Sequence, residues 1–258
     1  MKVKIINNHS FFTSFISIAF IIISWSLLNY LKLINPIFLP SPVQTFQALI
    51  IFITKPSFCF DIFITLYRAL CGLLLSIIIG VPLGLILGRI SWLYKLFEIP
   101  IEFFRAIPSS ALFPLFILFL GIGDCSKIGV VFYGSSLIMI INSYYGALPT
   151  KEKQDRINML RSFGANSYQI FKLAILRDAI PNISAGIRVC ISLSYVLVVV
   201  TEMFLGTNRG LGKLLYDLCL QYKIPEMYAV IITLGFIGFL SNQLYVLLEK
   251  KVIFWFKR

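Results

Sequence analysis

The sequence predicts an all-α, polytopic membrane protein with about six membrane-spanning helices. Hydrophobic residues make up 59% of the 258 residues and charged residues only 13%, whereas soluble domains average about 45–50% and about 25%. The mean hydropathy is +0.89. The apolar residues are gathered into runs of roughly 20 residues, the length that a helix needs to cross a bilayer. Residues 1–258 are therefore expected to form a single transmembrane domain, with a core at about 60–250.

Six apolar windows are the candidate spans, at about 11–31, 64–88, 97–120, 128–148, 183–205 and 228–253. The first follows Lys2 and Lys4, as the apolar part of a signal peptide would. No small-residue cleavage site follows it, so we interpret it as a retained span. The Pro-rich segment 35–44, NPIFLPSPVQ, is too punctuated for a helix.

The second span carries Gly80, Gly84 and Gly88 at four-residue spacing. This stripe either lets another helix approach closely or simply fits the neighbours of its own helix, and the spacing favours neither reading. Pro82 predicts a kink in the same span. The third span is expected to be irregular or broken near its start because it contains Pro100, Pro108 and Pro114.

Lysine and arginine orient the chain, because cytoplasmic loops carry an excess of them. With a cytoplasmic N-terminus, 14 basic residues fall in inside segments and six in outside segments. The inside residues are Lys2, Lys4, Arg89, Lys95, Lys151, Lys153, Arg156, Arg161, Lys172, Arg177, Lys250, Lys251, Lys257 and Arg258; the outside residues are Lys32, Lys55, Lys127, Arg209, Lys213 and Lys223. Both termini are therefore predicted to be cytoplasmic, and the outside segment 206–227 has room for a short amphipathic helix.

Arg188 and Glu202 are candidate functional polar residues of the fifth span. Fourteen residues of helix separate them by about 21 Å, too far for a direct pair. Each could be an interfacial anchor, a pathway residue or one half of a structural pair, since charges inside a membrane face protein or water. The spans contain no series of Asp, Glu or His residues typical of a proton relay.

Several kinds of chemistry are excluded. His9 is the single histidine, so no His-based catalytic pair or zinc site can form. No G-x-x-x-x-G-K-[ST] phosphate loop is present, so the chain is not expected to be an enzyme or to bind a cofactor. The net charge of +12 is spread between apolar runs, which argues against nucleic acid. The five cysteines form no CxxC pair and are expected to be buried, reduced thiols.

The central segment 151–181, KEKQDRINMLRSFGANSYQIFKLAILRDAIP, is polar and basic between two apolar runs. Its pattern predicts a helix over 152–163, a break at Gly164, and a second helix over about 168–178 capped by Asn166 or Ser167. Pro181 is expected to open the next span. A helix–glycine–helix element suits docking into a groove of a partner, but it could equally pack on its own membrane domain.

The same segment resembles the EAA loop of binding-protein-dependent ABC transporter permeases. The three family positions Glu-Ala-Ala align with Asn158, Met159 and Leu160, which are followed by Arg161, Phe163, Gly164 and Ala165. Further along, Pro181 aligns with the second proline of the family's LPAALP segment. The glutamate of the family pattern is replaced by Asn158, and both alanines are larger here.

The resemblance covers about 200 residues and is nearest to the nitrate/sulfonate/taurine-type permeases. The matching text includes LPSP at 39–42, TLYR at 65–68, GVPLG at 80–84, RAIP at 105–108, AGIR at 185–188, TEM at 201–203 and GLG at 210–212. It implies the fold of a type I ABC importer permease in a bacterial inner membrane. The permease would form the path for a small nutrient, such as a sulfonate, taurine or nitrate.

The resemblance also implies partners. These are an ABC ATPase that binds ATP and grips the loop around Gly164, a periplasmic or lipid-anchored substrate-binding protein, and a second permease copy forming a homodimer within membrane lipid. An ion-coupled secondary transporter or channel that works without an ATPase is the alternative.

Overall fold

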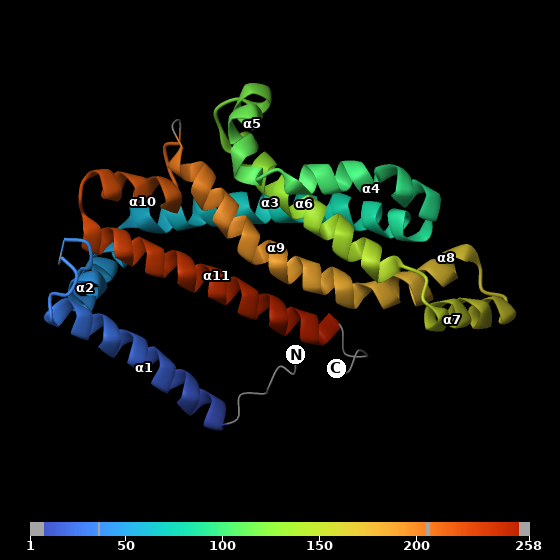
Figure 1. Ribbon diagram of the computed structural model, residues 1–258, viewed down its shortest axis with the longest axis horizontal. Helices are drawn as coiled ribbons and strands as arrows, with labels where there is room; N and C mark the ends of the chain where they lie inside the picture. The colour runs from blue at the N-terminus through green and yellow to red at the C-terminus, as the bar shows by residue number, and fades with distance from the viewer. Residues whose placement is uncertain (1–7, 36, 205–206, 253–258) are drawn as a thin grey trace.

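The apolar runs of the sequence form long helices in a computed structural model, which describes residues 8–35, 37–204 and 207–252, with side chains described between residues 16 and 251. These parts of the chain are all-helical (Figure 1). The helices are α1 (Asn8–Tyr30), α2 (Pro42–Ile53), α3 (Pro56–Arg89), α4 (Ser91–Ala106), the 3₁₀ turn η1 (Ser109–Leu112), α5 (Phe113–Leu120), α6 (Asp124–Ala147), α7 (Lys151–Ser162), α8 (Ser167–Ile170), the π-helical η2 (Phe171–Leu176), α9 (Arg177–Met203), α10 (Leu211–Leu220) and α11 (Ile224–Val252).

Helices α3, α6 and α9 form the core. Their contact surfaces contribute buried apolar side chains such as Leu73, Val131, Met139 and Val198. Four described helices are long and apolar enough to cross a membrane, namely α3, α6, the continuous helix 167–203, and α11; the bent α4–α5 pair would make a fifth. The first predicted span, 11–31, corresponds to α1, which over its described side chains is a shorter apolar helix, Ile16–Tyr30.

The glycines of the second span face α6. A Cβ atom added at Gly80 would lie 2.8 Å from the Cβ of Met139, and one at Gly88 would lie 2.7 Å from the Cβ of Ala147. At Gly84 it would overlap the carbonyl oxygen of Ile140. The two helices therefore pack backbone to backbone, which residues with larger side chains would prevent. Pro82 lies inside α3, which continues through it.

The third span is broken, at a different place from the one expected. Pro100 lies within α4, and the chain bends by 85° between α4 and the segment 109–120. The bend lies at Ile107 and Pro108, in the middle of the predicted window, because a residue before proline is driven to an extended conformation (Ile107 φ −77°, ψ 122°). Helix α5 consequently projects away from the α3–α6–α9 core (Figure 1).

Two proline-based predictions were wrong. The segment 35–44 was expected to be non-helical throughout, but α2 begins at Pro42, capped by Ser41 and Gln44, because proline is well suited to the first turn of a helix. Pro181 does not open a new helix. It lies inside α9, which continues η2 and α8 without interruption, so the second helix of the central segment does not end near residue 178.

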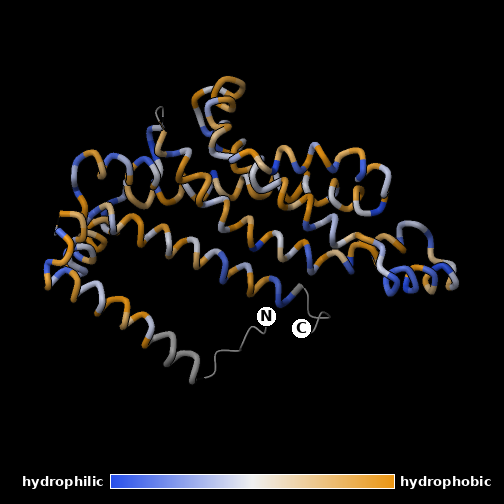
Figure 2. The backbone as a smooth tube through the Cα atoms, in the orientation of Figure 1, coloured by the Kyte–Doolittle hydropathy of each residue, from blue (hydrophilic) through white to orange (hydrophobic). Residues whose placement is uncertain are grey.

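The remaining helices pack against one edge of the core. Helices α2, α10 and α11 and the start of α3 share a second apolar cluster that includes Phe52, Phe58 and Leu211. Helix α10 lies within the segment 206–227, where a short amphipathic helix was expected, and buries Leu211 and Leu218. Helices α7 and α8 lie at one end of the molecule, and α2 and α10 at the other (Figure 1). Figure 2 shows that α7 is mostly hydrophilic, whereas the long helices are mostly hydrophobic.

Candidate functional site

The turn after α7 is set by Gly164. Its φ of +76° lies in the left-handed region, which glycine adopts without steric cost. The Gly164 N–H donates to the Arg161 carbonyl (2.9 Å) and the Ala165 N–H to the Leu160 carbonyl (3.0 Å). These two bonds form a Schellman motif, which satisfies the last carbonyls of α7. Asn166 then caps α8 through a capping box with Gln169.

The turn exposes large apolar side chains. Phe163 is 82% exposed, Tyr168 69% and Met159 54%, on a segment that is otherwise polar. Asn158 and Arg161 are also exposed, whereas Leu160 and Ala165 are half-buried. A Cβ atom at Gly164 would meet nothing within 4 Å, so the tip itself is open. The loop therefore presents an apolar end that nothing in the described part of the chain covers.

The base of the loop is tied to the core at two points. Lys153 Nζ donates to the carbonyls of Gly146 (2.7 Å) and Leu148 (3.3 Å), at the end of α6. Arg156 forms an ion pair with Asp178 at the start of α9. Ile157 is buried. A force on the loop tip can thus reach both α6 and α9.

Burial lowers the pKa of the Lys153 ammonium below its ordinary value, the Asp178 carboxylate opposes that shift, and the nearby guanidinium groups of Arg156 and Arg89 add to it. The two carbonyls that accept from Lys153 Nζ and the Asp178 carboxylate favour the ammonium form. The contact between α7 and α6 therefore has a strong electrostatic component.

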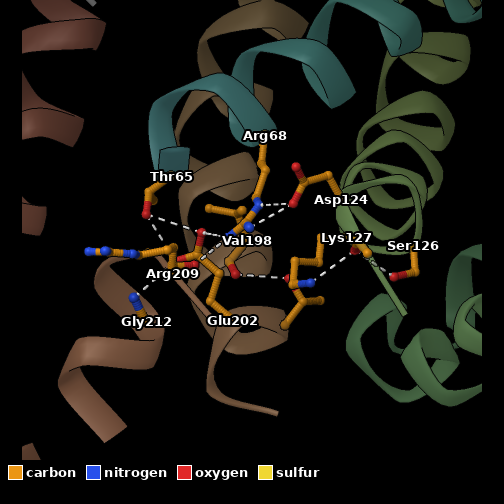
Figure 3. A network of polar contacts seen from close by, with 12 residues as sticks. Thr65, Arg68, Asp124, Ser126, Lys127, Val198, Glu202, Arg209 and Gly212 are labelled. Atoms are coloured by element: carbon orange, nitrogen blue, oxygen red, sulfur yellow. Dashed lines mark hydrogen bonds and ion pairs between the residues drawn. The ribbon is translucent and has the colours of Figure 1, made fainter. Parts of the chain in front are cut away.

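A buried polar cluster, which we call the Arg68 cluster, lies where α6 begins, at the opposite end of that helix from the α7–α8 loop. Figure 3 shows it from close by. Arg68 Nη1 lies 2.6 Å from Glu202 Oε1, and Arg68 Nη2 lies 2.6 Å from Asp124 Oδ1. Thr65 Oγ1 donates to Glu202 Oε2 (2.9 Å). The Glu202 side chain is fully buried, whereas that of Asp124 is 51% exposed. One arginine thus joins α3, α6 and α9.

The cluster also fixes the segment before α10. The Gly212 N–H donates to Glu202 Oε2 (2.9 Å), the Leu211 N–H to Thr65 Oγ1 (2.9 Å), and Arg68 Nη1 to the Arg209 carbonyl (2.8 Å). Gly210 has φ +127°, and a Cβ atom there would lie about 2.5 Å from the Glu202 carboxylate. Only glycine fits this position, because the backbone approaches the carboxylate closely.

The two polar residues singled out in the fifth span therefore have separate partners. Glu202 pairs with Arg68 of α3, and Arg188 pairs with Glu249 of α11, where Ser184 also donates to Glu249 (2.8 Å). Arg188 and Glu202 could each have been an interfacial anchor, a pathway residue or half of a structural pair. Their contacts have the geometry of structural pairs. Pro181 lies far along the chain from the Gly164 turn, within the helix that leads from the loop into the membrane.

Sequence reasoning missed Arg68, Thr65 and Asp124 as members of a site. Arg68 follows Thr65 by three residues and so shares its helix face, but nothing local indicates that Glu202, 134 residues later, completes the cluster. The expectation of buried cysteines was wrong for Cys59, Cys125 and Cys219, which are exposed; Cys190 is buried. Among the described residues, no group of His, Cys, Asp and Glu could hold a metal ion.

Comparison with known proteins gives a consistent result. Residues 80–254 match the model of the family "Binding-protein-dependent transport system inner membrane component". The chain is 29% identical to a Brucella abortus (strain 2308) protein described as an ABC transporter permease, and the match covers 85% of this chain and 87% of that one. It is 28% identical to a Bacillus subtilis (strain 168) protein assigned as an aliphatic sulfonates transport permease, over 92% and 85% of the two chains.

A solved structure shares the fold. A chain of the MetNI methionine ABC transporter in inward-facing conformations superposes with a TM-score of 0.63 at 18% identity. The match covers 77% of this chain and 95% of that one. Most of the helical arrangement described above is therefore common to both.

Proposed function

Because the chain belongs to the family of binding-protein-dependent transport system inner membrane components, we propose that the Gly164 turn couples it to its ATPase. The chain is the multi-pass permease subunit of an ABC importer, a transport subunit that acts with an ATPase and a substrate-binding protein. The family assignment favours this function over the alternative, an ion-coupled transporter or channel that works without an ATPase.

The observation that carries the coupling role is the apolar end of the α7–α8 loop. Phe163 and Tyr168 are exposed on both sides of a rigid glycine turn. An exposed aromatic pair next to polar residues is typical of a protein-binding surface. In our proposal these side chains enter a groove of the ATPase, and the Lys153 and Arg156 contacts carry its movement to α6 and α9. Met159 takes part in place of the alanine of the family pattern.

We also propose the finer features of the transporter. The permease works as a homodimer in a bacterial cytoplasmic (inner) membrane, with both termini and the α7–α8 loop in the cytoplasm. The positive charge of the loop supports this orientation. The binding protein, periplasmic or lipid-anchored, would then dock at the end that carries α2 and α10. The solute is a small nutrient such as a sulfonate, taurine or nitrate; the similarity to an aliphatic sulfonates permease supports this class.

Substitution of Gly164 tests the coupling role. Gly164→Arg and Gly164→Pro cannot adopt φ +76° without strain, so both are expected to abolish transport and transport-coupled ATP hydrolysis while the permease still inserts. Gly235→Ala is the matched control, because Gly235 is equally open but lies in the helical part of α11. Normal coupled hydrolysis in both Gly164 variants would show that the turn has no such role.

A further inference from the structure

An ion pair lies half-exposed on the helix before the 85° bend. Arg105 Nη2 is 2.7 Å from Glu102 Oε2, one helical turn apart on α4, and both side chains are 52% exposed. No residue of α4 is buried. The pair therefore faces away from the α3–α6–α9 core, unlike the Arg68–Glu202 pair, which is enclosed by it.

The Glu102–Arg105 pair lies at the level of the membrane's hydrocarbon interior. The Tyr133 hydroxyl donates to the Phe104 carbonyl (2.7 Å), and Ser109 lies against Gly134. Tyr133 is nine residues past the start of α6, about 14 Å along a helix that rises about 1.5 Å per residue. Helix α6 is 24 residues long and spans the hydrocarbon layer, which is about 30 Å thick. Phe104 and its neighbour Arg105 are thus level with the interior of that layer.

The backbone at the bend is irregular at the same depth. Pro108 has no N–H to donate to the Phe104 carbonyl, which accepts from the Tyr133 hydroxyl (2.7 Å) and from the Ile107 N–H (3.3 Å). Ser109 and Ser110 follow, both half-buried. Irregular backbone and charged side chains occur at this depth only where they are buried in protein or line water. The pair is not buried in its own subunit, so by this rule it faces water or a second subunit and not lipid.

We infer that Glu102 and Arg105 line the translocation path and together bind a zwitterionic solute, the guanidinium holding its anionic group and the carboxylate its cationic group. The inference rests on the proposed function, since a second permease copy would close the path. A simple anion that bound the other N–H donors of Arg105 would lie beside the Glu102 carboxylate, which would repel it. A zwitterion separates the pair and satisfies both halves, because Arg105 has further N–H donors that contact nothing else in the described part of the chain.

The first test measures whether water reaches the pair. Arg105→Cys would be made in a chain in which Cys59, Cys71, Cys125 and Cys219 are replaced by serine and the buried Cys190 is kept. The full transporter in proteoliposomes is treated with charged, membrane-impermeant thiol reagents. Because only a hydrated thiolate reacts, we expect modification at least about tenfold faster than in Ile78→Cys, an exposed apolar position of α3. Equal rates would overturn the inference.

The second test compares taurine with ethanesulfonate, which lacks the ammonium group. Glu102→Gln is expected to raise the KM for taurine transport by about tenfold or more, the effect of losing a charged contact, and not the KM for ethanesulfonate. Asp217→Asn, which removes the carboxylate of another exposed pair, is the matched control. Failure of the wild-type transporter to move taurine, or an equal effect of Glu102→Gln on both solutes, would overturn the inference. The proposed function would still stand if ATP hydrolysis depended on the binding protein and on Gly164.

Discussion

Replacing Glu202 by methionine should destabilise the permease far more than its single negative charge suggests. Glu202 is fully buried and accepts hydrogen bonds from Arg68, Thr65 and the Gly212 N–H. Methionine has a similar size but accepts none of them. Arg68 would keep the Arg209 carbonyl and a single carboxylate, that of the half-exposed Asp124, and the donors of Thr65 and Gly212 would lose an acceptor.

Removing one partner of a buried ion pair costs about 3–5 kcal/mol, because the other charge stays buried without compensation. Replacing both partners by apolar side chains is often close to neutral. The double variant Arg68→Met/Glu202→Met should therefore be more stable than Glu202→Met alone, since Asp124 can be hydrated once Arg68 is gone. The coupling free energy between the two residues should reach about 2–3 kcal/mol, near the upper end of measured couplings.

The assay is a double-mutant cycle on the purified permease, with the free energy of unfolding measured at equilibrium in mixed micelles. Lys213→Met/Asp217→Met provides the reference, because that pair is partly exposed and such pairs contribute about 0–1 kcal/mol. If Glu202→Met costs no more than the reference substitutions, or if the two cycles give the same coupling, the Arg68 cluster does not hold the four helices together.

Three further results are expected. Gly84→Leu should prevent assembly of a monodisperse permease in detergent, because its side chain overlaps the Ile140 carbonyl; an unchanged gel-filtration profile would show that the stripe is not a contact. Phe163→Ala should leave the melting temperature of the permease unchanged but reduce the amount of ATPase retained on it, since Phe163 is 82% exposed. Lys153→Met should lower ATP hydrolysis coupled to transport without releasing the ATPase, because the loop loses its link to the Gly146 carbonyl; loss of ATPase binding would place Lys153 in the docking surface instead.

Local signals were enough to predict the α7–α8 loop. A glycine after a polar helix, followed by Asn166, predicts a helix, a break and the capped start of a second helix, and each step depends only on residues within one turn. The left-handed conformation of Gly164 and the continuation of the second helix into α9 were not predicted. The long apolar runs likewise predicted the spans. Most of their boundaries moved by up to about eight residues, since the polar ends of helices such as α3 extend beyond the apolar window. The fifth span begins about 16 residues earlier than predicted, because its helix is continuous from residue 167.

The features that the sequence did not predict depend on tertiary contacts. Pro181 is a strong signal for a helix start, yet the packing of α9 against α6 keeps the helix continuous through it, next to the π-helical segment Phe171–Leu176. The pairing of Arg68 with Glu202 joins residues 134 positions apart. No periodic pattern encodes such a contact, because it depends on how three helices are placed relative to one another.

The most direct test of the account is co-purification of the tagged permease from its native membrane in a mild detergent, with mass spectrometry of the proteins that accompany it. The account predicts an ATPase with a phosphate loop, present with the wild-type chain and with Gly235→Ala but lost with Gly164→Arg. An ATPase retained equally by Gly164→Arg, or a permease that purifies alone and moves solute without ATP, would contradict the coupling role of the Gly164 turn.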